Sequence, residues 1–262
     1  KNDALFLIPE PKSPHGVDID PTGEYIVGSG KLAALLPVFS FDKMVKAIGK
    51  KDFEGDYEGI PVLKYNSVLH GEVQKPGLGP LHTEFDGKGN AYSTMFVSSE
   101  IVKWDIETLK VLDRSPTFYS TGHLMIPGGD SKKPFGKYLV AYNKITKDRY
   151  LPTGPELTQS AQLFDITGDK MQLLLDYPTI GEPHYAQAAP ADLIRNNGQL
   201  KIYDLKNNKH PRVAKGEKET KVVREGNKVP VYMSMIRSNF APDNIDGIKV
   251  ADEVYFHITN LV

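Results

Sequence analysis

The sequence predicts an all-β fold of the propeller type. A turn pattern recurs along the chain, in which an extended segment, a turn rich in Asp and Gly and a strand of alternating apolar residues follow one another, as in β-hairpins. The intervals between equivalent points fit propeller blades of roughly 40 to 50 residues with occasional insertions. The clearest copies span residues 17–27 and 84–92, and the pattern continues at 136–141 and 161–171.

The composition agrees with many short strands joined by tight turns, because the 262 residues include 23 glycines and 19 prolines. The formal net charge of −1 provides no field that would attract nucleic acid. No apolar run approaches the roughly 20 residues that span a bilayer. We therefore expect neither nucleic-acid binding nor membrane insertion. The chain has no cysteine, so disulfides and thiolate ligands are excluded within it.

One helix is expected in this β-rich chain. Apolar residues at 41, 44, 45 and 48 have the spacing of one helix face, and we interpret this helix as an insertion between blades. Residues 207–228 are polar and basic with few large apolar side chains, which is typical of a solvated linker. The sequence thus predicts propeller blades over 1–206, a linker over 207–228 and an incomplete second domain over 229–262. Residues 229–238 and 253–262 alternate as strands do within this second domain.

Four histidines stand beside Gly or Pro at the starts of predicted blades. His15 lies in Ser-Pro-His-Gly, directly before the first copy of the turn pattern, and His82 lies in Gly-Pro-Leu-His-Thr, in the corresponding place. His123 and His184 follow in Thr-Gly-His and Gly-Glu-Pro-His. Inner strands of a propeller surround a central axis, so side chains at equivalent inner positions form a ring. We therefore expect the four imidazoles to converge on one centre.

A ring of imidazoles is typical of a metal site for copper, zinc, iron or nickel, whereas magnesium and calcium prefer oxygen ligands. The alternative for any single histidine is a side chain that packs in the core or binds backbone groups beside a turn. Two other interpretations of the whole chain stay open, namely a non-catalytic propeller that serves as an interaction scaffold and a zinc-dependent propeller hydrolase. His70, His210 and His257 are predicted to lie in a loop, in the basic linker and in a strand, and to be structural or solvated.

Several motifs together resemble the C-terminal part of nitrous oxide reductase, and the resemblance extends across nearly the whole chain. It implies part of a seven-bladed β-propeller, followed by the first strands of a cupredoxin-like β-sandwich. The matching motifs are Ser-Pro-His15-Gly, residues 78–92, Gly122-His123-Leu, residues 144–155 and Glu182-Pro-His184. Ser13 stands where the family often has Asn, and Tyr185 replaces the acidic residue that usually follows the ligand histidine. Both departures resemble a divergent branch of the family.

The resemblance implies a tetranuclear copper-sulfide cluster held by seven histidines. His15, His82, His123 and His184 fall at four of those positions, and the other three are expected before Lys1. A binuclear copper centre is implied in the cupredoxin domain, with ligands expected after Val262. The resemblance also allows a bound calcium ion.

Lys144 and Glu182 also match residues that lie near the cluster in this family. The resemblance implies that Lys144 stabilises negative charge at the open edge of the cluster, and that Glu182 orients a histidine or relays protons. The alternatives are a surface ion pair for Lys144 and a turn carboxylate for Glu182.

The implied function is the two-electron, two-proton reduction of nitrous oxide to dinitrogen and water by a periplasmic enzyme. A c-type cytochrome is the implied electron donor, and the intact enzyme is implied to be a homodimer. This chain by itself is expected to be inactive.

Overall fold

The computed structural model describes residues 5–144, 159–179, 181–190, 219–236, 239–242 and 245–260. The chain divides into two compact units, Lys1–Leu193 and Ile194–Val262. Antiparallel four-stranded sheets make up most of the first unit, so the predicted all-β class is confirmed.

The first sheet has the order β1-β2-β3-β6, and an insertion separates its last two strands. The helix predicted around residues 41–48 forms this insertion together with a hairpin and a short second helix. Ser40 caps α1, because its hydroxyl accepts a hydrogen bond from the Lys43 N–H, and Lys51 ends the helix in a left-handed conformation. The elements are β1 (Pro14–Ile19), β2 (Tyr25–Gly30), β3 (Leu35–Ser40), α1 (Phe41–Lys50), β4 (Phe53–Tyr57), β5 (Ile60–Leu63), α2 (Tyr65–Val68) and β6 (Leu69–Gln74).

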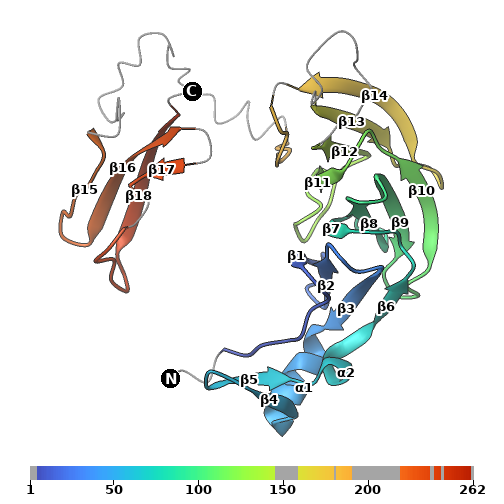
Figure 1. The fold of residues 1–262 in the computed structure, drawn as a ribbon, viewed down its shortest axis with the longest axis horizontal. Coiled ribbons are helices and arrows are strands. Elements are labelled where there is room, and N and C mark those ends of the chain that lie inside the picture. The colour runs from blue at the N-terminus through green and yellow to red at the C-terminus, as the bar shows by residue number, and fades with distance from the viewer. Residues whose placement is uncertain are drawn as a thin grey trace. The chain divides into compact units, whose positions relative to one another are not determined.

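The second and third sheets have the orders β7-β8-β9-β10 and β11-β12-β13-β14. Figure 1 shows the three sheets along an arc, with β1, β7 and β11 on its concave side. β7 contacts both β1 and β11, as expected for neighbouring blades of a propeller. The strands are β7 (Pro80–Phe85), β8 (Asn90–Met95), β9 (Glu100–Asp105), β10 (Val111–Pro116), β11 (Thr121–Met125), β12 (Tyr138–Asn143), β13 (Gln159–Asp165) and β14 (Gln172–Thr179).

Local turn chemistry explains the two clearest predicted hairpins, which are confirmed. The Asp20 carboxylate accepts hydrogen bonds from the N–H groups of Thr22 and Tyr25 between β1 and β2. Asp86 does the same for the N–H groups of Lys88 and Asn90 between β7 and β8. Gly23 and Gly87 have φ angles of 78° and 72°, a region that L side chains rarely adopt.

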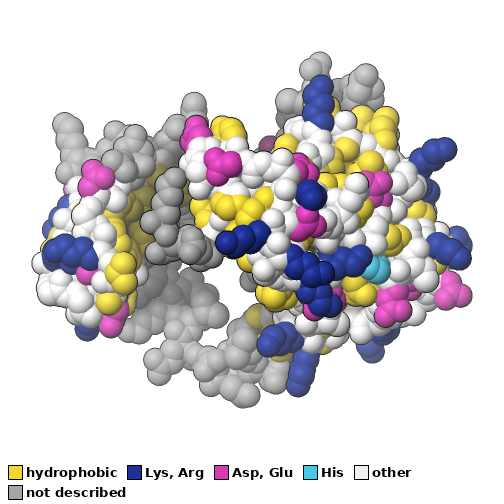
Figure 2. All heavy atoms as spheres, turned by 90° about the horizontal axis from the view of Figure 1, so that it is seen from below, with side chains coloured by type: hydrophobic (Ala, Val, Ile, Leu, Met, Phe, Trp, Pro, Cys, Tyr) yellow, Lys and Arg dark blue, Asp and Glu magenta, His cyan; other side chains and the backbone are white. Residues whose placement is uncertain are grey.

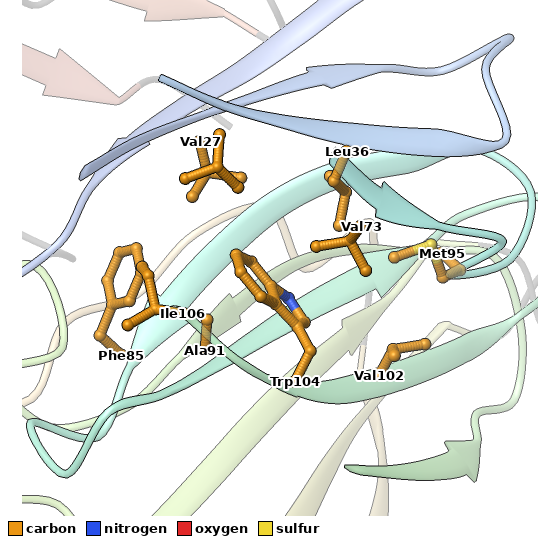
Figure 3. Close-up of a cluster of buried hydrophobic side chains, with 10 residues drawn as sticks. Val27, Leu36, Val73, Phe85, Ala91, Met95, Val102, Trp104 and Ile106 are labelled. Carbon is orange, nitrogen blue, oxygen red and sulfur yellow. The ribbon is translucent and has the colours of Figure 1, made fainter. Parts of the chain in front are cut away.

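Apolar side chains fill the space between neighbouring sheets. Trp104 from β9 is fully buried between the first and second sheets, and its indole N–H donates to the Ser93 hydroxyl at 2.9 Å. Figure 3 shows Trp104 among side chains from both sheets, including Val27, Leu36 and Phe85. A second cluster, which includes Tyr92, Leu124, Leu139 and Phe164, joins the second sheet to the third. This packing fixes where the inner strands β1, β7 and β11 lie.

The second unit contains a smaller sheet in which β16 is central. It pairs antiparallel with β15 and β17 and parallel with β18, and it buries Val229, Val231 and Met233. The strands predicted within 229–238 and 253–262 are present as β16 and β18. The strands are β15 (Lys221–Val222), β16 (Lys228–Ile236), β17 (Asn239–Ala241) and β18 (Glu253–Asn260).

The predicted linker 207–228 lies outside the described residues up to residue 218, and β15 falls within its last part. The predicted domain boundaries stay predictions. Among the described residues there is no helix with the length and apolar character needed to cross a membrane. Figure 2 shows one face of the molecule, on which both basic and acidic side chains appear.

Candidate metal centre

Each of the three inner strands carries one of the predicted histidines within a β-bulge. The pairing with the second strand shifts between Pro14 and Val17 in β1, between Pro80 and Thr83 in β7 and between Thr121 and Leu124 in β11. A bulge leaves an extra residue unpaired and re-aims the side chains next to it. The same irregularity thus recurs in three blades at the positions of His15, His82 and His123.

The predicted common register of these histidines is wrong by one residue at His15. His15 directly follows the paired residue Pro14, whereas His82 and His123 stand two residues after the paired Pro80 and Thr121. The burial of the three side chains differs accordingly. His15 is exposed, His82 is half-buried and His123 is buried.

The four predicted histidines nevertheless meet. The ring centroids of His82 and His123 lie 3.9 Å apart in a stacked arrangement, and His15 approaches them at 5.0 and 6.5 Å. His184 comes from the segment after β14, and its ring centroid lies 4.5 Å from that of His123. The structure therefore gathers four imidazoles into one cluster, three from the inner strands β1, β7 and β11 and one from the segment after β14.

Two ring nitrogens of this cluster are suited to a metal. Nε2 of His82 and Nδ1 of His123 are buried and have no hydrogen-bond partner. Buried polar atoms without a partner are rare and costly, so a ligand for them is chemically reasonable. No three His, Cys, Asp or Glu side chains in the described ranges are already arranged around one metal position. Metal binding by the stacked rings therefore requires the rings to turn until their nitrogens face a common point.

Two histidines of the cluster, His15 and His123, favour the neutral form. Burial lowers the pKa of His123 to about 3, and the nearby His82, His184 and Lys144 contribute to the lowering. Burial also lowers the pKa of His15, together with the charges of His82 and Lys144. Neutral imidazole is the form that binds metals. Neither of these two side chains therefore has to release a proton near pH 7 in order to bind one.

Lys144 and Glu182 lie at the edge of this cluster, next to His184. The Lys144 ammonium is 2.9 Å from Oε1 of Glu182 and 3.3 Å from Nδ1 of His184, and the same Glu182 oxygen is 3.2 Å from that nitrogen. The hydrogen bond from Lys144 is the main cause that lowers the pKa of Glu182. A Cβ atom at Gly122 would overlap the Lys144 side chain, so this glycine leaves the room that Lys144 occupies.

A carboxylate-lined cleft beside His82 and His123 was not expected from the sequence. The cleft has a volume of about 320 Å³, and Asp18, Glu84 and Asp130 are among its lining residues. The Asp18 carboxylate accepts the Thr83 N–H at 2.7 Å, and Oδ1 of Asp18 lies 3.9 Å from Nδ1 of His82.

Glu84 is buried in this cleft, and its Oε2 atom has no hydrogen-bond partner. Burial raises the pKa of Glu84 to about 8, helped by the charges of Asp130 and Asp18. The sequence signal for this cleft is that Asp18 and Glu84 each stand two residues before the turn aspartate of their hairpin, Asp20 or Asp86.

Neither of the two remaining histidines that the structure describes joins the cluster. His70 lies in strand β6, not in the loop predicted for it, where its ring packs against Tyr25 and its Nε2 is 3.2 Å from the carbonyl oxygen of Glu107. His257 lies in β18 and stacks on Tyr232. His210 lies outside the described residues.

Comparisons with known proteins agree with the resemblance read from the motifs. Residues 114–184 match the nitrous oxide reductase propeller repeat, a range that includes β11 to β14 and His184. The nitrous-oxide reductase of Stutzerimonas stutzeri is 36% identical over 97% of this chain and 40% of its own length. The enzymes of the same name from Cupriavidus necator and Ralstonia nicotianae are 36% and 35% identical over 96% of the chain and 38% of theirs.

The chain thus spans about two fifths of the length of these relatives, and sequence similarity to them covers both of its units. The family match and the propeller sheets point to the same kind of protein. Over the part that it spans, the chain is similar to the nitrous-oxide reductases, and its residues 114–184 match the propeller repeat of that family.

Proposed function

We propose that this chain supplies part of a copper site that reduces nitrous oxide to dinitrogen and water. The observation that carries the proposal is the convergence of His15, His82, His123 and His184, with buried ring nitrogens that lack partners. Relatives that are named nitrous-oxide reductase support the substrate. In this proposal the four imidazoles hold one side of a copper-sulfide cluster, and histidines elsewhere in the full-length protein complete it.

When bound, such a cluster supplies electrons and a position for the substrate. The residues of this chain provide geometry and charge around it. His123 offers a buried, neutral ring. Asp18 lies close enough to His82 to influence the orientation of its ring. The packing between the three sheets holds the strands that carry these side chains in place.

Lys144 has the geometry to stabilise charge at the open edge of the site. An ammonium group has three N–H donors, and the contacts with Glu182 and His184 use two of them. Among the described residues the third donor has no acceptor, and in this proposal it donates to the oxygen atom of nitrous oxide, which gains negative charge and then protons during reduction. Glu182 holds the ammonium in place through this ion pair, and the hydrogen bond from Lys144 lowers the pKa of Glu182.

Further parts of the proposal rest on the family resemblance. They are a binuclear copper centre in a cupredoxin domain of which the second unit is the beginning, a c-type cytochrome as electron donor, a homodimer, a periplasmic location and a calcium ion.

Metal analysis of the full-length protein, combined with an assay for nitrous oxide consumption with a reduced electron donor, tests the proposal. Copper with acid-labile sulfide and consumption of nitrous oxide are the expected results. Zinc with hydrolytic activity would favour the propeller hydrolase, and a protein that retains no metal would favour the interaction scaffold.

A further inference from the structure

Thr94 joins two histidine-bearing bulges through a single hydroxyl group. It lies in β8, directly opposite the bulge that holds His82, and its side chain is fully buried. The hydroxyl oxygen accepts the N–H of His82 at 3.3 Å and donates to the carbonyl oxygen of Gly122 at 2.6 Å. Gly122 directly precedes His123 within the bulge of β11. One side chain thus connects the backbone of one candidate ligand to the residue before the next.

The bulges make this connection necessary. Backbone groups within a bulge are left out of the strand ladder, so the His82 N–H and the Gly122 carbonyl need partners of another kind. Thr94 supplies both, and the second bond crosses from the second sheet to the third. The bond from Thr94 therefore constrains the distance between β7 and β11 at the level of the imidazoles.

The first sheet offers an internal comparison. Ser29 stands opposite the bulge that holds His15, as Thr94 does for His82, and it is also buried. The Ser29 hydroxyl has no hydrogen-bond partner. The rings of His82 and His123, which Thr94 connects, lie 3.9 Å apart, whereas the His15 ring is 5.0 Å from His82 and 6.5 Å from His123. The closest ring pair among these three is the one that the hydroxyl bridges.

We infer that Thr94 is a positioning residue for the metal centre: its hydroxyl sets the spacing of His82 and His123 without touching metal or substrate. This inference rests on the proposed function, because it assigns the spacing a purpose in metal binding. Residues that orient metal ligands typically contribute roughly 10- to 100-fold to metal affinity. Loss of the hydroxyl is therefore expected to weaken retention of copper by about that factor.

The test compares Thr94→Val with Thr94→Ser in the full-length protein. Valine keeps the shape of threonine and removes the hydroxyl, whereas serine keeps the hydroxyl. Copper retention against a competing chelator and the absorption spectrum of the bound copper are measured. Thr94→Val should lose copper roughly 10-fold more readily with an altered spectrum, and Thr94→Ser should behave as the wild type does.

Thr117→Val is the matched control, because Thr117 is a buried threonine whose hydroxyl accepts a hydrogen bond from Thr121 in the connection before β11. It should lower the stability of the fold and leave copper retention and the spectrum unchanged. If Thr94→Val fails to fold, Thr94→Ala against Thr94→Ser isolates the same hydroxyl without placing a methyl group against the Gly122 carbonyl.

The possible failures are distinguishable. A wild-type protein that binds no copper overturns the proposed function. A wild-type protein that binds copper, together with hydroxyl-free variants that retain it with the same spectrum as Thr94→Ser, overturns the role of Thr94 alone.

Discussion

The imidazole rings of His82 and His123 stack with a centroid distance of 3.9 Å and an angle of 22° between their planes, although they come from inner strands of two different sheets. Burial and the neighbouring His82 ring both disfavour a proton on His123, so the pKa of His123 is lowered.

His123 makes the stability of the metal-free protein depend on pH. Its pKa is about 3 in the folded state and about 6.5 in the unfolded state, so the unfolded state takes up a proton first on acidification. This contribution to stability is present above pH 6.5 and is lost as the pH falls toward 3, with a maximal slope of about 1.4 kcal/mol per pH unit. His123→Leu should flatten the dependence of the unfolding free energy in urea between pH 6.5 and 4. Equal slopes in the two proteins would contradict the lowered pKa.

Glu84 makes the stability of the metal-free protein depend on pH in the opposite direction. Its pKa is raised from 4.5 to about 8 in the folded state, so its contribution to stability is fully present below pH 4.5 and is lost as the pH rises through 8. Glu84→Gln is neutral at every pH and keeps the shape of the side chain. The variant should therefore gain stability relative to the wild type between pH 5 and 8 in the metal-free protein. A stability difference that does not change with pH would show that Glu84 ionises normally.

Lys144→Ala should leave the copper content of the full-length protein near the wild-type value and depress its turnover of nitrous oxide. Lys144 touches His184 and Glu182 but is not itself a metal ligand in this account. Loss of one preorganised charge typically reduces the rate roughly 100- to 1,000-fold. Lys46→Ala is the control, because Lys46 forms an ion pair with Asp42 on the exposed side of α1. Wild-type turnover by Lys144→Ala would remove this lysine from the mechanism.

Trp104 is expected to dominate the contact between the first two sheets. Its side chain is fully buried, and Trp104→Ala should lower the unfolding free energy by about 3 to 5 kcal/mol, since it removes a large side chain from the core. Val45→Ala on the exposed face of α1 serves as the comparison and should change stability by less than about 0.5 kcal/mol. Denaturant unfolding measures both values, and similar losses in the two variants would contradict the packing described here.

The sequence allowed the hairpins and the meeting of the histidines to be predicted, because both depend on short-range signals. Asp20 and Asp86 form their turns with residues that follow directly. The offset of His15 was not predictable in this way, since it depends on where a bulge interrupts pairing with another strand.

The cleft around Glu84 and the bridge through Thr94 were missed for a related reason. A carboxylate or a hydroxyl in an alternating strand is usually interpreted as solvent-facing. Glu84 is buried against Gly129 and Thr94 against Gly122, and both contacts depend on the packing of a neighbouring sheet. The spacing of Asp18 and Glu84 from their turn aspartates marks the two carboxylates as equivalent, but no local pattern shows that Glu84 or Thr94 is buried.

Copper and acid-labile sulfide, measured in the purified full-length protein and in its His123→Ala variant, test the shared metal centre most directly. The wild type should contain copper together with sulfide, and His123→Ala should lose copper and nitrous oxide reduction together. His70→Ala, which alters a histidine outside the cluster, should match the wild type. Absence of copper from the wild type, or unchanged copper and normal activity in His123→Ala, would contradict the account.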